Sequence, residues 1–383
     1  MFGEKNIIKH FFIMTPIDNY SRNICIAIHA KCNLSCVYCY EIKKSTSTFN
    51  IDKTLNDLSE VLNTKTQKGT KIKLHGGEPF VDFKSLKTFC EKLWSVSHKE
   101  KYKIHITTNG TLVHSEIAKW VSKNKDKLNL KLSLDGTKLS HNINRSNSFD
   151  LIDLNFFIKT FPNIRINMTI TPQTIPFLNI NVQYLHSVGF KYINTNFALL
   201  NDWEDKKLEK VYYNQLKDLS KYYVANNYIY PISLLSGDIK RLLHNNIFYS
   251  PCNIGNKSAY DFETKELYPC HLFFPSICGS ANSKLVKGID FKNRSQLESD
   301  VCLNCKLLNL CKTCYAENLI RRGSVKNRDM TYCNYHKITI YWQSVIEYHK
   351  IIRKKSFTKE DYKKMLAIKL IQKEIGYLKD IYK

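Results

Sequence analysis

The segment Lys31–Tyr40, KCNLSCVYCY, carries the pattern that decides how the rest of the chain is interpreted. Its cysteines, Cys32, Cys36 and Cys39, are spaced C-x₃-C-x₂-C, and Tyr38 stands just before the third. Thiolates this close together converge on one soft metal centre. Because a 4Fe–4S cube normally takes four cysteines, three would leave one iron open to a small molecule. A zinc site or three core thiols is the alternative, but zinc sites favour paired C-x₂-C or His spacings, and no fourth cysteine is nearby.

The composition limits the classes of protein open to this chain. Its 383 residues are enough for about two or three domains, and 43% hydrophobic residues are ordinary for a soluble protein. The sequence contains no run of ~18 apolar residues, so it predicts no membrane span, and its first residues do not have the pattern of a signal peptide. We therefore expect a cytoplasmic location and no membrane partner. In that compartment 13 cysteines favour metal or redox chemistry over disulfides.

The net charge is strongly positive, since 58 Lys and Arg stand against 34 Asp and Glu to give +24. Such an excess would suit a nucleic-acid or acidic-peptide partner. However, the lysines are scattered, and Arg353-Lys354-Lys355 is among the few tight clusters. The sequence therefore favours solvated basic faces, and a nucleic-acid partner is not expected.

From Ile24 onward, short β-rich runs alternate with longer amphipathic stretches. The expected strands are 24–29, 71–75, 103–107, 128–134, 165–171 and 192–198, and the expected helices are 51–66, 85–97, 115–123, 150–159 and 175–187. Six such units with nearly continuous apolar strands predict an α/β fold with a parallel sheet covered by helices. In these folds chemistry lies at the carboxyl ends of the strands.

Polar motifs follow three of the expected strands. They are His75-Gly76-Gly77-Glu78-Pro79, Thr107-Thr108-Asn109-Gly110 and Ser133-Leu134-Asp135-Gly136. Adjacent glycines let backbone approach a ligand closely, and a glutamate can pair with an ammonium group. Each motif alone could be a simple turn. Their common position after strands, behind the cysteine segment, favours a shared binding site.

Together the cysteine segment and these loops resemble the radical SAM enzymes. The resemblance implies a partial (β/α)₆ barrel whose open iron holds the amino and carboxylate groups of S-adenosylmethionine. One electron would then release a 5′-deoxyadenosyl radical. The residues it implies as cofactor contacts are Tyr38, Gly76, Gly77, Glu78, Asn109, Ser133 and Arg145. Arg145 could pair with the methionine carboxylate or form a surface salt bridge, and Asp135 is a candidate catalytic residue.

A second group of cysteines begins at Cys252 and has at its centre C-x₂-C-x₅-C-x₂-C. Alone, this pattern could be a zinc ribbon. Behind the first triad it resembles a SPASM domain, which holds two auxiliary 4Fe–4S clusters and would bring the total to three. When the ligand positions of the SPASM pattern are carried over to this sequence, the resemblance implies Cys252, Cys270 and Cys314 as ligands of the first auxiliary cluster. The second takes Cys302, Cys305, Cys311 and Cys333.

The chain departs from the SPASM pattern in three ways. Lys265 stands where glycine is expected, and the spacing from Cys311 to Cys314 is one residue short. The fourth ligand of the first auxiliary cluster is not obvious. We favour Cys278, and otherwise that iron would be open to a substrate thiolate. His271 occupies the position of an aspartate proposed as a base in anaerobic sulfatase-maturating enzymes, so it is either a proton acceptor or a bystander.

These features predict five segments. They are an N-terminal extension over 1–23, a radical SAM partial barrel over 24–203, a helical bridge over 204–249, a SPASM domain over 250–340 and a C-terminal helical segment over 341–383. The resemblance implies a maturase that abstracts hydrogen from a ribosomally made peptide and forms a cross-link or other modification. Its expected partners are a precursor peptide or small protein, an electron donor such as flavodoxin or ferredoxin, and a separate leader-binding protein.

Two other functions stay open from the sequence. The first is an anaerobic sulfatase maturase, which oxidises Ser or Cys to formylglycine. The second is a zinc-stabilised nucleic-acid-binding protein, suggested by the +24 charge and the cysteine pairs. The second lacks any recognisable nucleic-acid-binding element and leaves the loops around Glu78 and Asn109 unexplained.

Overall fold

The structure is a computed structural model that describes residues 20–41, 49–244, 252, 254–255, 258–261 and 264–382. Most of the predicted N-terminal extension, residues 1–19, lies outside the described part. Among the described helices, none combines the length and apolar character needed to cross a membrane.

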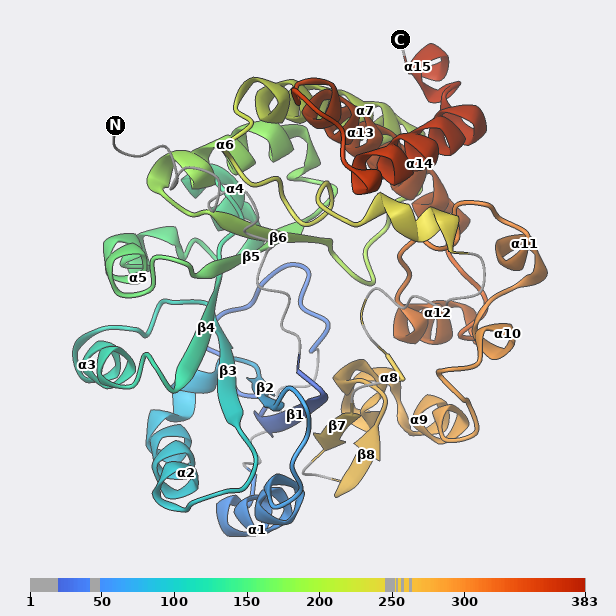
Figure 1. Ribbon diagram of the computed structural model, residues 1–383. Coiled ribbons are helices and arrows are strands. Elements are labelled where there is room, and N and C mark those ends of the chain that lie inside the picture. Colours follow the sequence, from blue (N-terminus) through green and yellow to red (C-terminus); the bar gives the residue numbers. More distant parts are fainter. Residues whose placement is uncertain are drawn as a thin grey trace, which may run out of the picture.

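One eight-stranded sheet organises the chain, with strand order β6-β5-β4-β3-β2-β1-β7-β8. Its first six strands pair in parallel in chain order, while β7 lies parallel to β1 and pairs antiparallel with β8. The strands are β1 Arg22–His29, β2 Thr70–Gly76, β3 Tyr102–Thr108, β4 Leu128–Ser133, β5 Arg165–Ile170, β6 Tyr192–Phe197, β7 Ser258–Asp261 and β8 Glu266–Tyr268. Figure 1 shows β1–β6 curving around an interior, which is the partial barrel that the sequence predicted.

Helices cover the outside of this barrel (Figure 1). Those between the parallel strands are α1 Ile51–Leu62, α2 Phe83–Ser95, α3 Ser115–Lys123, α4 Lys138–Asn144, α5 Leu154–Thr160 and α6 Leu178–Val188. The later helices are α7 Lys206–Ala225, α8 Pro275–Cys278, α9 Ser280–Val286, α10 Arg294–Leu297, α11 Asp300–Leu303, α12 Tyr315–Arg322, α13 Met330–Ile352, α14 Lys359–Ile375 and α15 Leu378–Ile381.

All six predicted strands and five predicted helices are present, with ends shifted by a few residues. Helix α4 was missed because its sequence, KLSHNIN, is short and lacks an apolar period. The predicted helix over 150–159 is divided into a 3₁₀ turn at Phe149–Leu151 and helix α5. The division follows Asp153, whose carboxylate accepts a hydrogen bond from the Phe156 amide and so begins a new helix.

The strands place opposite kinds of side chain on their two faces. In β2, Ile72 and Leu74 are buried against the helices, whereas Lys71, Lys73 and His75 are only partly buried. Because side chains of a strand alternate between faces, these three polar residues point into the barrel. The barrel interior is therefore polar, and the apolar core lies between the sheet and its helices.

Two hydrophobic clusters divide the chain. The larger one joins the barrel to α7, α13 and α14, and the smaller one contains Phe273, Leu297 and Tyr315 from the cysteine-rich region. Helix α13 crosses the predicted boundary at residues 340–341 and packs along α7. Helix α14 lies in the predicted C-terminal helical segment and packs on α13 and on the 3₁₀ turn Ile239–Leu243. The five segment boundaries remain predictions.

The turn between β7 and β8 contains Lys265, the residue at the expected glycine position. Its φ of 60° lies in the left-handed region, and its amide donates to the Asp261 carbonyl at 2.8 Å. Because glycine adopts this conformation without strain, the SPASM preference for glycine has a local steric reason here.

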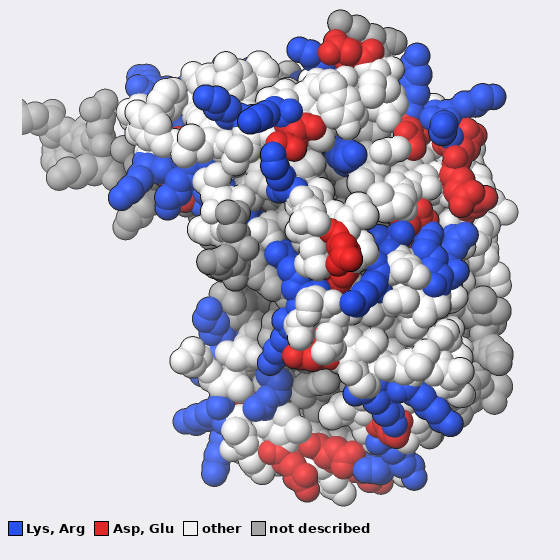
Figure 2. Space-filling model, turned by 90° about the vertical axis from the view of Figure 1, so that its right-hand side faces the viewer, with Lys and Arg blue, Asp and Glu red and all other residues white. Residues whose placement is uncertain are grey.

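Surface charge is dispersed on the face drawn in Figure 2. Lys and Arg side chains are spread across it, and Asp and Glu side chains lie among them. This face shows no single basic patch, which is the distribution that the sequence favoured.

Candidate active site

A cavity of about 240 Å³ lies at the carboxyl ends of β1–β4, and we call it the triad cavity. Its lining includes each residue that the sequence predicted for the first cluster and for cofactor contact. These are Cys32, Cys36, Cys39, Tyr38, Gly76, Gly77, Glu78, Asn109, Ser133 and Arg145. The tertiary structure therefore brings together residues spread over more than a hundred positions of the sequence. Their individual roles remain proposals.

The two glycines after β2 are required by the neighbouring strand. A Cβ at Gly76 would lie 2.2 Å from the His29 carbonyl oxygen, and one at Gly77 would lie 2.3 Å from that of Lys31. The Gly77 amide donates to the His29 carbonyl at 3.2 Å. The glycines thus let the end of β2 cross tightly over the start of the cysteine segment, a reason that the sequence analysis did not identify.

Glu78 is buried and holds two loops together. Its carboxylate accepts hydrogen bonds from the Asn109 amide at 2.6 Å, the Thr108 hydroxyl at 2.8 Å and the Phe80 amide at 3.2 Å. Burial raises the pKa of Glu78 to about 7, although these three donors favour its charged form. A cation reaching this carboxylate would stabilise the charged form further.

The cysteine segment is tied to the loop after β3 by a residue that sequence reasoning missed. The Asn33 side-chain carbonyl oxygen accepts a bond from the Asn109 side-chain amide at 2.9 Å, and its own amide donates to the Thr111 hydroxyl at 2.8 Å. Asn33 lies between Cys32 and Cys36, so its position inside the motif was the only available signal.

Asp135 and Arg145 form a buried ion pair beside the triad cavity. The Arg145 Nε lies 2.9 Å from the Asp135 carboxylate, which also accepts from the Tyr38 hydroxyl at 3.0 Å and the Thr169 amide at 2.8 Å. Asp135 has no exposed surface and does not line the cavity. The prediction that Asp135 is catalytic stays untested, and the contacts of its oxygens hold Tyr38 and Arg145 in place. Arg145 lines the cavity, so its contact with a carboxylate stays a proposal.

The second cysteine group lines a separate cavity of about 750 Å³, which we call the cysteine cavity. Seven of the eight predicted ligands lie on its wall, namely Cys252, Cys270, Cys302, Cys305, Cys311, Cys314 and Cys333. The short spacing before Cys314 does not remove it, because Cys314 is the residue from which α12 begins.

Electrostatic interactions divide these seven thiols into two groups. Burial raises the pKa of Cys311 to about 12, with smaller contributions from the sulfurs of Cys333, Cys305 and Cys302. Burial also raises the pKa of Cys314 to about 12, and there the contributing sulfurs are those of Cys270 and Cys252. These neighbours are the two ligand sets that the resemblance implied, so the grouping agrees with the carry-over by position.

Cys278 is more buried than the other cysteines of this region. It is 6% exposed within the smaller hydrophobic cluster, and its sulfur lies 3.1 Å from the Ser283 hydroxyl. It does not line the cysteine cavity. The prediction that Cys278 is the fourth ligand stays untested, because its thiol lies off the wall of the cysteine cavity while Cys270 and Cys314 pack against the same hydrophobic cluster.

Cysteine thiolates are the donors that an iron–sulfur cube takes. In the described residues, no three His, Cys, Asp or Glu side chains converge closely enough to hold one metal ion. A cube instead distributes its thiolates over several irons, so its ligands surround a volume. Four grouped thiols in the second set and three in each of the others match that arrangement.

His271 lies where the barrel meets the cysteine-rich region. Its Nε2 is 3.1 Å from the Tyr40 hydroxyl, its Nδ1 is 3.7 Å from the Cys270 sulfur, and its ring lies 4.1 Å from that of His75. The side chain lines both the cysteine cavity and a third cavity of about 450 Å³ inside the barrel, which we call the barrel cavity. Its proposed role as a proton acceptor stays untested.

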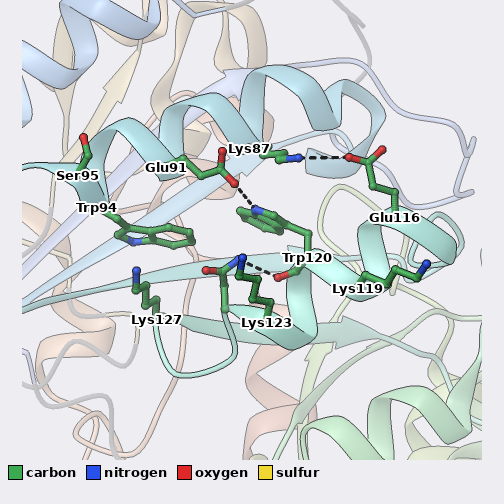
Figure 3. A pocket seen from close by; sticks show the side chains of 10 residues that line it. Lys87, Glu91, Trp94, Ser95, Glu116, Lys119, Trp120, Lys123 and Lys127 are labelled. Carbon is green, nitrogen blue, oxygen red and sulfur yellow. Dashed lines mark hydrogen bonds and ion pairs between the residues drawn. The ribbon is translucent and has the colours of Figure 1, made fainter.

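A further pocket lies outside the barrel, between α2 and α3. Figure 3 shows Trp94 and Trp120 along its wall, with the Trp120 indole donating to Glu91 at 2.9 Å and the Lys87 ammonium paired with Glu116. None of its lining residues belongs to the three cavities described above. Its contacts join two helices, and we assign it no part in the chemistry.

Comparison with known proteins agrees with this geometry. Residues 26–153 match the family described as the Radical SAM superfamily. Over 347 residues the chain is 23% identical to a cysteine-type anaerobic sulfatase-maturating enzyme of Clostridium perfringens, a match that covers 83% of this chain and 92% of the other.

Two solved structures share the fold. The structure of native anSMEcpe with bound AdoMet has a TM-score of 0.64 at 21% identity and covers 86% of this chain and 100% of its own. The Streptococcus suis protein SuiB bound to precursor peptide SuiA has a TM-score of 0.53 at 18% identity, covering 82% and 76%. At these identities the likeness establishes the fold alone.

Proposed function

This chain is a radical SAM enzyme, and from that premise we propose that it is a maturase that modifies a residue within a ribosomally made peptide. The observation that supports the proposal is that the three cavities adjoin and share lining residues. The triad and barrel cavities share Lys73, Thr107 and Asn167. The barrel and cysteine cavities share Asn194, Asn196, Cys252, Cys270 and His271. A residue held in the barrel would lie between both groups of cysteines.

A bound cluster and S-adenosylmethionine supply a carbon radical that can take hydrogen from an unactivated carbon. Around that chemistry, Cys32, Cys36 and Cys39 would hold the first cluster, and Glu78 would accept a bond from the methionine ammonium. The Asp135–Arg145 pair would keep Tyr38, and with it the cysteine segment, in position. The interior asparagines would orient peptide amides.

The second cysteine region is proposed to hold two further clusters on its two groups of thiols. These clusters would accept the electron released when a new carbon–carbon, carbon–sulfur or carbon–oxygen bond forms in the peptide, or when an alcohol or thiol is oxidised. A flavodoxin or ferredoxin is the proposed electron donor, and a separate leader-binding protein would present the peptide.

Sulfatase maturation is the second candidate, because the similarity to the Clostridium perfringens enzyme extends over most of both chains. That activity would convert a Ser or Cys to formylglycine. His271 and Tyr40 would be the nearby groups able to exchange a proton in that reaction.

The test is product analysis after anaerobic reconstitution with iron and sulfide. The enzyme, S-adenosylmethionine and a one-electron reductant are incubated with peptides encoded by short reading frames beside the gene, and separately with a peptide from a sulfatase maturation site. Mass loss in the first set supports the peptide maturase. Formylglycine in the second set alone would replace it with the sulfatase maturase.

A further inference from the structure

The barrel interior is cationic, and the strand register shows why. Lys71 and Lys73 of β2 alternate with Ile72 and Leu74, which are buried against the helices. Lys131 of β4 alternates in the same way with Leu130 and Leu132. The three lysines consequently face the interior, and all three line the barrel cavity.

Other cationic or polar groups extend this lining. Lys131 is paired in register with Arg165 on β5, and Lys73 is paired with His105 on β3, so these side chains share the interior face. Among the lining residues that the structure describes there is no Asp or Glu. The remaining polar wall is formed by the amides of Asn23, Asn167, Asn194 and Asn196.

Lys73 is the cation that connects this lining to the chemistry. It lines the triad cavity as well as the barrel cavity. Glu41, also on the wall of the triad cavity, is already paired with His75 at 3.0 Å. Within the described part of the chain, the Lys73 ammonium makes no hydrogen bond or ion pair. A half-buried ammonium between other cations gains most from an anion, since the reduced dielectric strengthens the attraction.

We propose that the barrel cavity selects a peptide segment that carries a carboxylate side chain next to the modified residue, and that Lys73 binds this carboxylate. The proposal rests on the peptide maturase function and adds the substrate class to it. The asparagine side chains would form hydrogen bonds with the amides of the extended peptide. The +24 charge of the chain thus has a functional part inside the barrel, even though the lysines outside are dispersed.

Binding of two short fluorescent peptides tests the proposal. They differ only in carrying Asp or Asn on either side of a central Ala, which avoids thiol binding to iron. The full chain, anaerobically reconstituted and saturated with S-adenosylmethionine, should bind the Asp peptide about tenfold more tightly than the Asn peptide. Lys73→Gln should abolish this preference, Lys73→Arg should retain it, and Lys101→Gln, at an exposed position before β3, should leave it unchanged.

Three outcomes would overturn the proposal. The first is equal affinity of the wild type for both peptides, and the second is an unaltered preference in Lys73→Gln. The third is displacement of the bound Asp peptide by GTP at lower concentration than by unlabelled Asp peptide, with the affinity for GTP lost in Lys73→Gln. The last would assign the cations to nucleotide phosphates. Modification of neutral peptides without any acidic preference would leave the maturase function standing while this inference failed. Preferential binding of the Asp peptide, without a modified product from any peptide, would support this inference while the maturase function failed.

Discussion

The guanidinium of Arg328 donates a hydrogen bond to the sulfur of Cys311, with an N–S distance of 3.1 Å. The same guanidinium is held by Glu298, whose carboxylate lies 2.7 Å from its Nε and is 2% exposed. Tyr315 donates to that carboxylate at 2.8 Å. The Glu298 carboxylate, itself held by Tyr315, therefore keeps Arg328 against Cys311, one of the thiols proposed for the second auxiliary cluster.

This contact predicts that Arg328 raises the reduction potential of a cluster bound there, because a cationic donor stabilises the extra electron. Replacing Arg328 by Met together with Glu298→Gln should lower that potential by about 50–100 mV, the equivalent of one charge-assisted bond. A redox titration followed by electron paramagnetic resonance measures it. Glu298→Gln alone is the matched control, and an unchanged potential in the double variant would contradict the prediction.

Replacing the first triad tests the origin of the radical chemistry. The Cys32, Cys36 and Cys39 triple alanine variant should lose reductive cleavage of S-adenosylmethionine, and its iron content should fall by about four atoms, one cube. Signals from the second cysteine region should persist because its thiols line a different cavity. Continued cleavage in this variant would exclude the assignment.

Cys278→Ala should leave the iron content and cluster spectra unchanged, because this thiol forms a hydrogen bond with the Ser283 hydroxyl inside an apolar cluster. Its cost should appear instead as about 1 kcal/mol of lost folding stability. Cys314→Ala is the matched comparison, since Cys314 lines the cysteine cavity and should lose cluster signal. Loss of iron in Cys278→Ala would restore it as a ligand.

The raised pKa of the buried Glu78 carboxyl group should make the folding stability depend on pH. Because its folded-state pKa is raised by burial to about 7 from an ordinary value of 4.5, its contribution is complete below about pH 4.5 and is lost as the pH rises through about 7. The size should be about 3 kcal/mol, an order-of-magnitude value. Chemical denaturation of Glu78→Gln between pH 4.5 and 7 should therefore give a flatter profile than the wild type. Parallel profiles would show that Glu78 does not titrate there.

The turn at Lys265 offers a backbone test. Since Lys265 has a φ of 60°, Lys265→Gly should stabilise the protein by about 0.5–1 kcal/mol through relief of the left-handed strain. Gly323→Ala is the reverse experiment, because Gly323 has a φ of 70° and an added Cβ would meet nothing within 4 Å. That variant should lose a similar amount, and thermal unfolding of both measures the effect. A destabilised Lys265→Gly would mean that the lysine side chain contributes more than the strain costs.

The sequence alone determined the barrel and the position of its site. Alternating apolar runs and amphipathic stretches reflect the local periods of strands and helices, so β1–β6 and most of their helices were predictable. The spacing of Cys32, Cys36 and Cys39 is also local, and parallel strands place the loops that follow them at one edge. The predicted cluster and cofactor residues on the wall of the triad cavity were accordingly named from the sequence, whereas Lys73, Glu41 and Asn167 were not.

Only the tertiary structure decided which side chains meet across distant segments. It placed Cys278 beside Ser283 in the smaller hydrophobic cluster and off the wall of the cysteine cavity. It also surrounded the Asp135 carboxylate with hydrogen-bond donors from Tyr38, Arg145 and Thr169, which come from three separate parts of the chain. It also brought Lys73 and Lys131 into one cavity, since strand alternation sets the face that each side chain takes and only the curvature of the sheet brings β2 and β4 around one interior.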